Sequence, residues 1–202
     1  MPHGDNTYIR TFTGRRYWPL YPHAADVDVV DIAHALAYKC RYAGHVRRFY
    51  SVAEHAVRLK READVRRRTW AERYAALHHD DGEGYLPDIA RPVKKAMPGF
   101  YDIERANELV ICHALGVQYP FPDIVHELDS RALTDEMMAL LPYRDWDGEL
   151  YGHGPGTWRY GKPLGLPGDE LGWEPEVAMA AFLAEHYAML AEKRDAEEPV
   201  HD

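Results

Sequence analysis

The sequence lacks the features that mark several classes of protein. It contains only two cysteines, Cys40 and Cys112, which are too few for a disulfide framework and stand in neither a zinc-binding nor a redox motif. No apolar run approaches the roughly 20 residues that a membrane-spanning helix needs. The first residues also lack the apolar stretch of a secretory signal. We therefore expect a cytoplasmic protein with no membrane partner.

An excess of positive charge is absent as well. The chain has 24 lysines and arginines against 33 aspartates and glutamates, and its net charge is -9. A protein that binds nucleic acid without sequence preference needs an overall basic surface or a large basic patch, so no nucleic-acid partner is expected. Local basic clusters remain at residues 15–16 and 39–48. Such clusters either bind a small anion or form a solvated basic face.

The spacing of apolar residues predicts an all-α protein of one domain, spanning residues 1–202. No run alternates as a strand of a sheet does, and no internal repeat is visible. Helices are expected at about 26–39, 51–63, 69–80, 100–115, 122–141 and 175–193, with a short helical turn near 91–95. The first 25 residues and the Gly- and Pro-rich segment 142–173 have no helical period. The long segment is a lid, an oligomer contact or an ordered surface loop.

Local signals mark where some of these helices begin and end. Ser51 and Glu54, and again Thr69 and Glu72, have the spacing of a capping box, in which each side chain satisfies a backbone N–H at the helix start. Gly116 stands where a glycine commonly terminates a helix. These signals predict helices that begin after Ser51 and Thr69 and one that ends at Gly116.

A histidine and a carboxylate stand side by side near a predicted helix end, at His79 and Asp80. Imidazole nitrogen and carboxylate oxygen together suit Mn, Fe, Co, Ni or Zn. Two further ligands would have to come from other helices, and His55 and Asp129 are each flanked by apolar residues, so each can point inward. Taken alone, His55 could equally be a core histidine and Asp129 a surface ion-pair partner. Spacing leaves open whether the four side chains meet.

Four segments resemble those of one protein superfamily. The segments are SVAEHA (51–56), HHDDGEGYLPDIARPVK (78–94), VHELD (125–129) and RRYWPL (15–20). In combination they resemble the HD-domain phosphohydrolases, in particular the branch that contains bacterial 5'-deoxynucleotidases and phage dATP triphosphohydrolases. The resemblance covers roughly residues 8–141. It implies an HD-type helical bundle with a metal-dependent phosphohydrolase site.

The resemblance also implies a role for individual residues. The metal ligands would be His55, His79, Asp80 and Asp129. The catalytic acids would be Glu83, which handles protons around the attacking water, and Asp88 in the same loop. The substrate-binding residues would be Arg16, Trp18, Lys94, Arg47, Arg48 and His126. His126 occupies a position where the family usually has a lysine, and Tyr17 separates Arg16 from the tryptophan that it normally precedes.

The expected activity is hydrolysis of 2'-deoxynucleotide phosphates. A dNTP triphosphohydrolase that releases deoxynucleoside and triphosphate is the leading interpretation, and a 5'-deoxynucleotidase acting on dNMP is the alternative. A non-catalytic nucleotide-binding effector is a third possibility, whereas the segment RRYWPL argues against a cyclic-nucleotide or alarmone hydrolase. The resemblance further implies one divalent transition metal (Co, Mn, Zn, Fe or Ni), an additional Mg on the phosphates, and a homo-oligomer (dimer or hexamer) in the cytosol of a bacterium or a phage-infected host.

Overall fold

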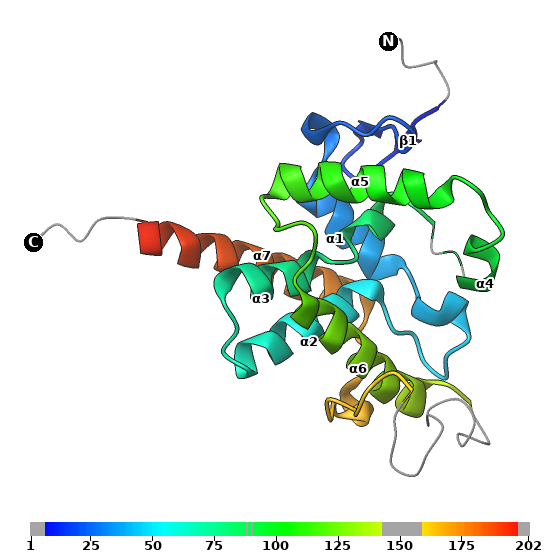
Figure 1. The fold of residues 1–202 in the computed structure, drawn as a ribbon, viewed down its shortest axis with the longest axis vertical. Coiled ribbons are helices and arrows are strands. Elements are labelled where there is room, and N and C mark those ends of the chain that lie inside the picture. The colour runs from blue at the N-terminus through cyan, green and yellow to red at the C-terminus, as the bar shows by residue number, and fades with distance from the viewer. Residues whose placement is uncertain (1–6, 88, 90, 143–158, 198–202) are drawn as a thin grey trace, which may run out of the picture.

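The structure is a computed structural model, and it describes residues 7–87, 89, 91–142 and 159–197. The prediction of an all-α protein is confirmed, because the described residues are mostly helical and their sheet is a small two-stranded one (Figure 1). The α-helices are α1 (Val29–Tyr38), α2 (Val52–Val65), α3 (Trp70–His78), α4 (Arg91–Lys94), α5 (Phe100–Leu115), α6 (Asp123–Leu140) and α7 (Pro175–Glu197). Short 3-10 helices are η1 (Ala24–Asp26), η2 (Arg41–Gly44), η3 (Asp81–Gly84) and η4 (Gly168–Glu170).

The predicted helix signals are confirmed with one exception. Thr69 and Glu72 form the reciprocal capping box at the start of α3, and Gly116 ends α5 with a left-handed φ of 70°. At the start of α2, Ser51 accepts a hydrogen bond from the backbone N–H of Glu54. The carboxylate of Glu54 does not complete that capping box. It is buried and accepts the backbone N–H groups of residues 172 and 173, so it anchors a distant segment instead.

The N-terminal segment is more regular than the sequence predicted. Strand β1 (Ile9–Arg10) pairs antiparallel with β2 (Arg16–Tyr17), whereas the sequence, which shows no helical period here, predicted no paired strands. Tyr17 explains why the hairpin is held in place. Its buried ring stacks on that of Tyr85 at 3.7 Å, and its hydroxyl donates to Oδ1 of Asn107 on α5 at 2.6 Å.

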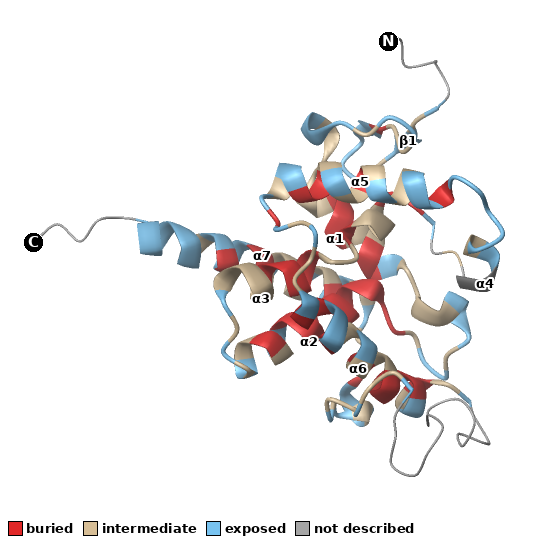
Figure 2. Cartoon of the chain, in the orientation of Figure 1, coloured by how far each residue is buried: buried red, intermediate tan, exposed pale blue. Residues whose placement is uncertain are grey.

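Helix α2 lies at the centre of the fold. It packs against α1, α3, α6 and α7, and all its residues from Val52 to Lys60 are buried (Figure 2). A helix covered on several faces buries polar positions together with apolar ones, and any polar group buried in this way needs a partner. His55 is one of these buried positions. The central place of α2 therefore brings an imidazole into the interior of the bundle.

The described part of the Gly- and Pro-rich segment is an ordered surface loop. Asp135 on α6 accepts three consecutive backbone N–H groups, those of residues 164, 165 and 166. Arg131 donates to the carbonyl of Lys162 at 2.8 Å. Of the three alternatives for residues 142–173, the ordered loop fits residues 159–173, and residues 143–158 lie outside the described part.

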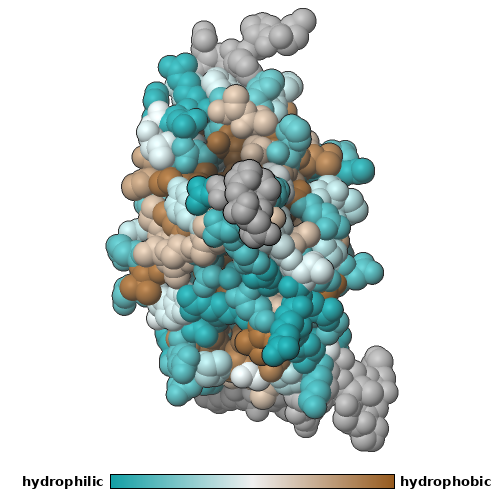
Figure 3. All heavy atoms as spheres, turned by 90° about the vertical axis from the view of Figure 1, so that its left-hand side faces the viewer, coloured by the Kyte–Doolittle hydropathy of each residue, from teal (hydrophilic) through white to brown (hydrophobic). Residues whose placement is uncertain are grey.

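Exposed hydrophobic side chains form several separate groups among hydrophilic ones on the face that contains the C-terminal end of α7 (Figure 3). Among the helices that the structure describes, none combines the length and the apolar composition of a membrane span.

Candidate metal centre and adjoining pocket

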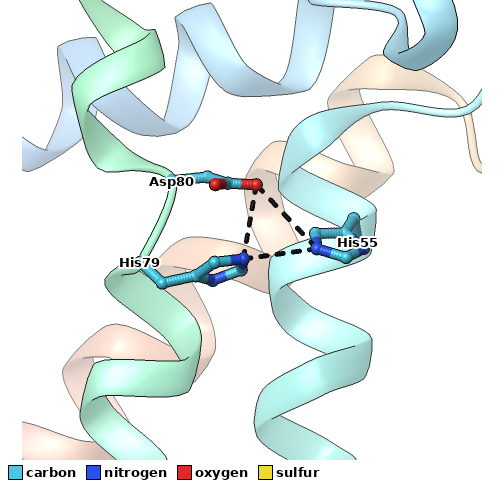
Figure 4. A group of neighbouring side chains, drawn as sticks. All are labelled: His55, His79 and Asp80. Atoms are coloured by element: carbon cyan, nitrogen blue, oxygen red, sulfur yellow. Dashed lines mark hydrogen bonds and ion pairs between the residues drawn. The ribbon is translucent and has the colours of Figure 1, made fainter. Parts of the chain in front are cut away.

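Three side chains from two segments converge on one point: His55, His79 and Asp80 (Figure 4). The Nε2 atoms of the two histidines lie 3.3 Å apart. Oδ2 of Asp80 lies 3.4 Å from Nε2 of His79 and 3.8 Å from Nε2 of His55. Three donor atoms at these separations can hold a single metal ion between them. The structure thus brings together three of the four predicted ligands as one group.

The end of α3 explains how adjacent residues can share this point. The prediction that the helix continues to Asp80 was wrong, because α3 ends at His78. Within a helix, successive side chains diverge by about 100°. Asp80 instead leaves the helical conformation, with φ -104° and ψ 12°. That change of direction turns its carboxylate back toward the imidazole of His79.

His78 and Asp81, which flank His79 and Asp80 in the sequence, anchor this turn to the rest of the fold. Nδ1 of His78 lies 2.7 Å from Oδ2 of Asp81, and its Nε2 lies 3.1 Å from Nδ1 of His186 on α7. All three side chains are buried. Burial raises the pKa of Asp81, although the charge of His78 opposes that shift. The flanking positions therefore fasten the turn to α7 while His79 and Asp80 face the other way.

Hydrogen bonds orient both candidate histidine ligands. Nδ1 of His79 lies 3.0 Å from the carbonyl oxygen of Ala76, which can only accept, so this nitrogen carries the proton. Nδ1 of His55 lies 2.5 Å from Oε1 of Glu136. In both rings Nε2 is left to face the shared point, as second-layer contacts commonly arrange for metal-binding histidines. Two imidazole nitrogens and a carboxylate oxygen form a donor set that fits a divalent transition metal.

Asp129, the fourth predicted ligand, reaches the edge of the group from α6. Its Oδ1 lies 3.2 Å from Nε2 of His55. Burial raises the pKa of the Asp129 carboxyl, but the hydrogen bond and charge of His55 outweigh burial and lower it below its usual range. An ionised carboxylate at this place can complete the donor set.

Glu136 is the residue that the sequence analysis missed. It is completely buried on α6 and accepts hydrogen bonds from the hydroxyls of Tyr42 and Tyr50, each at 2.9 Å, besides its contact with His55. Burial raises its pKa, but the charges of Arg41 and His55 outweigh burial and lower the pKa to about 2. A signal was present, because Glu136 follows Asp129 by about two helical turns and so shares its face of α6.

Arg41 is a second missed residue, and it connects two of the carboxylates of the site, those of Glu136 and Asp80. Its Nε lies 3.2 Å from Oε2 of Glu136, and its Nη1 lies 3.4 Å from Oδ2 of Asp80. The following residues, Tyr42 and Ala43, adopt positive φ values of 57° and 50°, which are uncommon for residues with a side chain. This tight turn lets Arg41 and Tyr42 both reach Glu136. A guanidinium therefore stands directly beside the candidate metal ligands.

A pocket of about 140 Å³ opens onto His79 and Asp80. Glu83, from η3, lines it beside Lys94, and the backbone carbonyl of Glu83 is held by the ammonium group of Lys39. Two carboxylates of α5 that the sequence analysis did not select, Glu104 and Glu108, line the pocket as well; their helical spacing is i, i+4, which places both on one face. Lys94 donates to Glu104 at 2.6 Å.

Unlike Lys94, the other predicted substrate-binding residues are not among those that line this pocket in the described part of the chain. The guanidinium of Arg16 packs over the ring of Tyr8, which also lies 5.8 Å from the ring of Trp18. Arg48 donates to the backbone carbonyls of residues 168 and 169. Two further predicted residues, Arg47 and His126, are exposed. The contacts described for Arg16 and Arg48 are therefore with parts of the chain other than the metal group, and Asp88 lies outside the described residues.

The protonation of His55 predicts how metal binding depends on pH. Burial and Arg41 lower the pKa of His55, but Glu136 and Asp129 outweigh them and raise it to about 9. In the metal-free protein, protonated His55 is stabilised by the carboxylates of Glu136 and Asp129. Its contribution to the stability of the fold is therefore complete below about pH 6.5 and is lost as the pH rises through 9. A metal ion needs the neutral imidazole. We expect the affinity for Mn²⁺ to rise up to about tenfold per pH unit below pH 9, with release of a proton.

Isothermal titration calorimetry between pH 6.5 and 8.5 measures this dependence. Repeating the titrations in buffers of different ionisation enthalpy counts the protons released. An affinity that is unchanged over this range, with no proton released, would show that His55 is not the ligand that exchanges a proton for the metal.

Comparisons with known proteins relate the chain to two proteins that are named as uncharacterized. No family model matches it. It is 34% identical to the uncharacterized protein YfdR of Escherichia coli K12 over 111 residues, which are 55% of this chain and 60% of YfdR. It is 32% identical over 192 residues to the uncharacterized protein RCAP_rcc00048 of Rhodobacter capsulatus, which covers 90% of this chain and 94% of that protein. The chain belongs to the same family as RCAP_rcc00048. Neither relative's name records an activity, so the geometry of the site has to carry the functional argument.

Proposed function

We propose that the protein hydrolyses the phosphate group of a 2'-deoxynucleotide with the help of a divalent transition metal. The observation that carries this proposal is the convergence of two imidazole Nε2 atoms and the carboxylate of Asp80 at the mouth of a pocket that also contains Glu83 and Lys94. A metal group beside an acid and a cation matches what phosphate-ester hydrolysis requires. The four segments that resemble deoxynucleotidases support a deoxynucleotide as the substrate.

Each group in the site has a separate task in this proposal. A divalent ion at the group lowers the pKa of water and neutralises charge on the phosphoryl oxygens. The guanidinium of Arg41, 3.4 Å from Asp80, offers charge-assisted hydrogen bonds to a phosphate held beside that carboxylate. Lys94 adds a second positive charge from the pocket wall. Glu83, on the same wall, accepts a proton from the attacking water and returns it to the leaving oxygen.

Glu83→Gln should separate catalysis from metal binding. The amide keeps the size of the side chain but cannot take up the proton, so we expect turnover to fall about 100-fold or more, as is typical when a general acid–base is removed. The affinity for Mn²⁺ should stay unchanged, because Glu83 is not a member of the metal group. Phosphate release and calorimetric metal binding are measured on the same preparation.

Glu127→Gln is the matched control for this variant. Glu127 lies on the exposed side of α6 and pairs with Arg131 at 3.0 Å, away from the pocket. We expect this variant to keep full turnover. Full turnover of Glu83→Gln itself would assign the proton transfer to another group.

The substrate and product are identified by a panel of reactions. The protein is incubated with dNTPs and dNMPs in the presence of Co²⁺, Mn²⁺, Zn²⁺ or Mg²⁺. Release of triphosphate identifies a dNTP triphosphohydrolase, and release of orthophosphate from dNMP identifies a 5'-deoxynucleotidase. Absence of turnover with every nucleotide and metal would reject the proposed activity and favour the alternative of a non-catalytic nucleotide-binding protein.

A further inference from the structure

The pocket that opens onto His79 and Asp80 is lined mainly by acidic residues among its charged side chains. Among the described residues, four carboxylates line the pocket, those of Asp80, Glu83, Glu104 and Glu108, together with the ammonium group of Lys94. Asp80 belongs to the metal group, and Glu83 is the proposed proton carrier. Glu104 and Glu108 therefore remain as two negative charges without a part in the proposed chemistry.

Both of these carboxylates are held in place. Lys94 donates to Glu104 at 2.6 Å, so the ammonium group that lines the described pocket is paired with one of these acids. The hydroxyl of Tyr119 donates to Glu108 at 3.0 Å. Each carboxylate keeps further acceptor positions, because an ionised carboxylate can accept about four hydrogen bonds. The wall thus offers fixed acceptors and an excess of negative charge.

This charge distribution discriminates between one phosphate group and several. The charge of a single phosphate bound beside Asp80 would be offset by a divalent ion at the metal group and by Arg41, which lies 3.4 Å from that carboxylate. Additional phosphate groups that extend into the pocket would meet Glu104 and Glu108, and like charges repel one another. Hydroxyl and amino groups, in contrast, can donate hydrogen bonds to the same carboxylates.

We propose that Glu104 and Glu108 are specificity-determining residues, which restrict the substrate to a single phosphate group and bind hydroxyl or amino donors of its organic part. The inference rests on the proposed function and deepens it. It favours a deoxynucleoside monophosphate over a triphosphate for this pocket, which has a volume of about 140 Å³.

The test compares dAMP with dATP by two readouts. The first is the ratio of kcat/KM for the two nucleotides in the Mn²⁺-loaded protein. The second is the ratio of their dissociation constants, measured by calorimetry on the Mn²⁺-loaded Glu83→Gln variant, in which turnover is slow. We expect both ratios to favour dAMP in proteins that keep Glu104 and Glu108.

Neutral replacements of the two carboxylates should shift these ratios toward dATP. Glu108→Gln keeps the hydrogen bond from Tyr119 and removes one negative charge, and we expect a shift of up to about fivefold, as for removal of one partly exposed charge interaction. Glu104→Gln, which also releases Lys94, should act in the same direction, and the double variant should shift the ratio further. Glu127→Gln, whose charge lies outside the pocket, should leave the ratio unchanged.

The outcomes separate this inference from the proposed function. A preference for dATP that neither Gln replacement alters would overturn the inference while leaving phosphohydrolysis intact. A preference for dAMP that both replacements weaken would support it. If no nucleotide is turned over, the proposed function fails, and the calorimetric ratios still decide whether Glu104 and Glu108 select for one phosphate. Failure of both nucleotides to bind would reject the two proposals together.

Discussion

Replacing Glu136 by glutamine should lower the affinity for Mn²⁺ at pH 8.5 by roughly 10- to 100-fold, the usual effect of losing a group that orients a metal-binding histidine. The carboxylate holds Nδ1 of His55 at 2.5 Å and directs Nε2 toward the candidate metal. A glutamine presents an amide NH₂ to surroundings that consist of donors, namely Tyr42, Tyr50 and Arg41. At least one donor would then lose its acceptor, and His55 would lose the charge that supports it.

The size of this effect should depend on pH in a defined way. Glu136 is also a main cause of the raised pKa of His55. In the wild type a proton therefore competes with the metal below about pH 9, whereas in Glu136→Gln that competition is weaker. We expect the difference in metal affinity to be largest at pH 8.5 and to narrow toward pH 6.5. A difference that grows as the pH falls would contradict the assigned hydrogen bond.

The same substitution should lower the stability of the fold. Glu136 is completely buried and its partner Arg41 is only 16% exposed, and removing one partner of a buried pair commonly costs about 3 to 5 kcal/mol, so we expect a loss toward the lower end of that range. Thermal unfolding followed by circular dichroism measures this loss. Glu136→Asp, which keeps the charge, provides a second variant if the glutamine variant does not fold. Glu127→Gln, exposed on the same helix, should change neither stability nor metal affinity.

Local features of the fold could be predicted because their causes lie within a few residues. The Thr69–Glu72 capping box depends on two side chains three positions apart, and the end of α5 depends on Gly116 alone. The Ser51–Glu54 pair has the same spacing, yet Glu54 is buried and binds backbone groups of residues 172 and 173. Nothing near Glu54 in the sequence records that the loop before α7 returns to this point. A local signal therefore fails where a distant segment competes for the same side chain.

The residues of the candidate site likewise differ in how far the sequence alone could predict them. The adjacency of His79 and Asp80 made them visible in the sequence, and Asp129 and His55 could be added only through the resemblance to a known family. The basic residues were the least predictable part. Arg47 and Arg48 stand in the cluster from which a phosphate contact was expected, but the arginine that reaches Asp80 is Arg41. Arg41 reaches Asp80 because the two residues after it adopt positive φ values and because an isolated β-bridge joins Cys40 to Ser51. The spacing of apolar residues predicts neither feature.

Replacing Asp80 by asparagine should abolish metal binding and hydrolysis together. The amide keeps the shape of the side chain but loses the negative charge that faces His55, His79 and Arg41. A metal ion contributes several kcal/mol to such a reaction, so we expect phosphate release to fall on the order of 1,000-fold. The fold should persist, because Asp80 lies outside α3 and its side chain is 22% exposed.

Asp102→Asn, in the exposed first turn of α5, is the matched control and should keep full metal affinity and turnover. Together with Glu83→Gln, the Asp80 variant separates two roles within one pocket. Glu83→Gln should bind Mn²⁺ and fail to turn over, whereas Asp80→Asn should do neither. A folded Asp80→Asn protein that released phosphate at the wild-type rate would remove the metal group from the reaction, whatever the behaviour of Glu83. If both variants bound nucleotide normally and the wild type released no phosphate, the same residues would instead form the binding site of a non-catalytic nucleotide-binding effector.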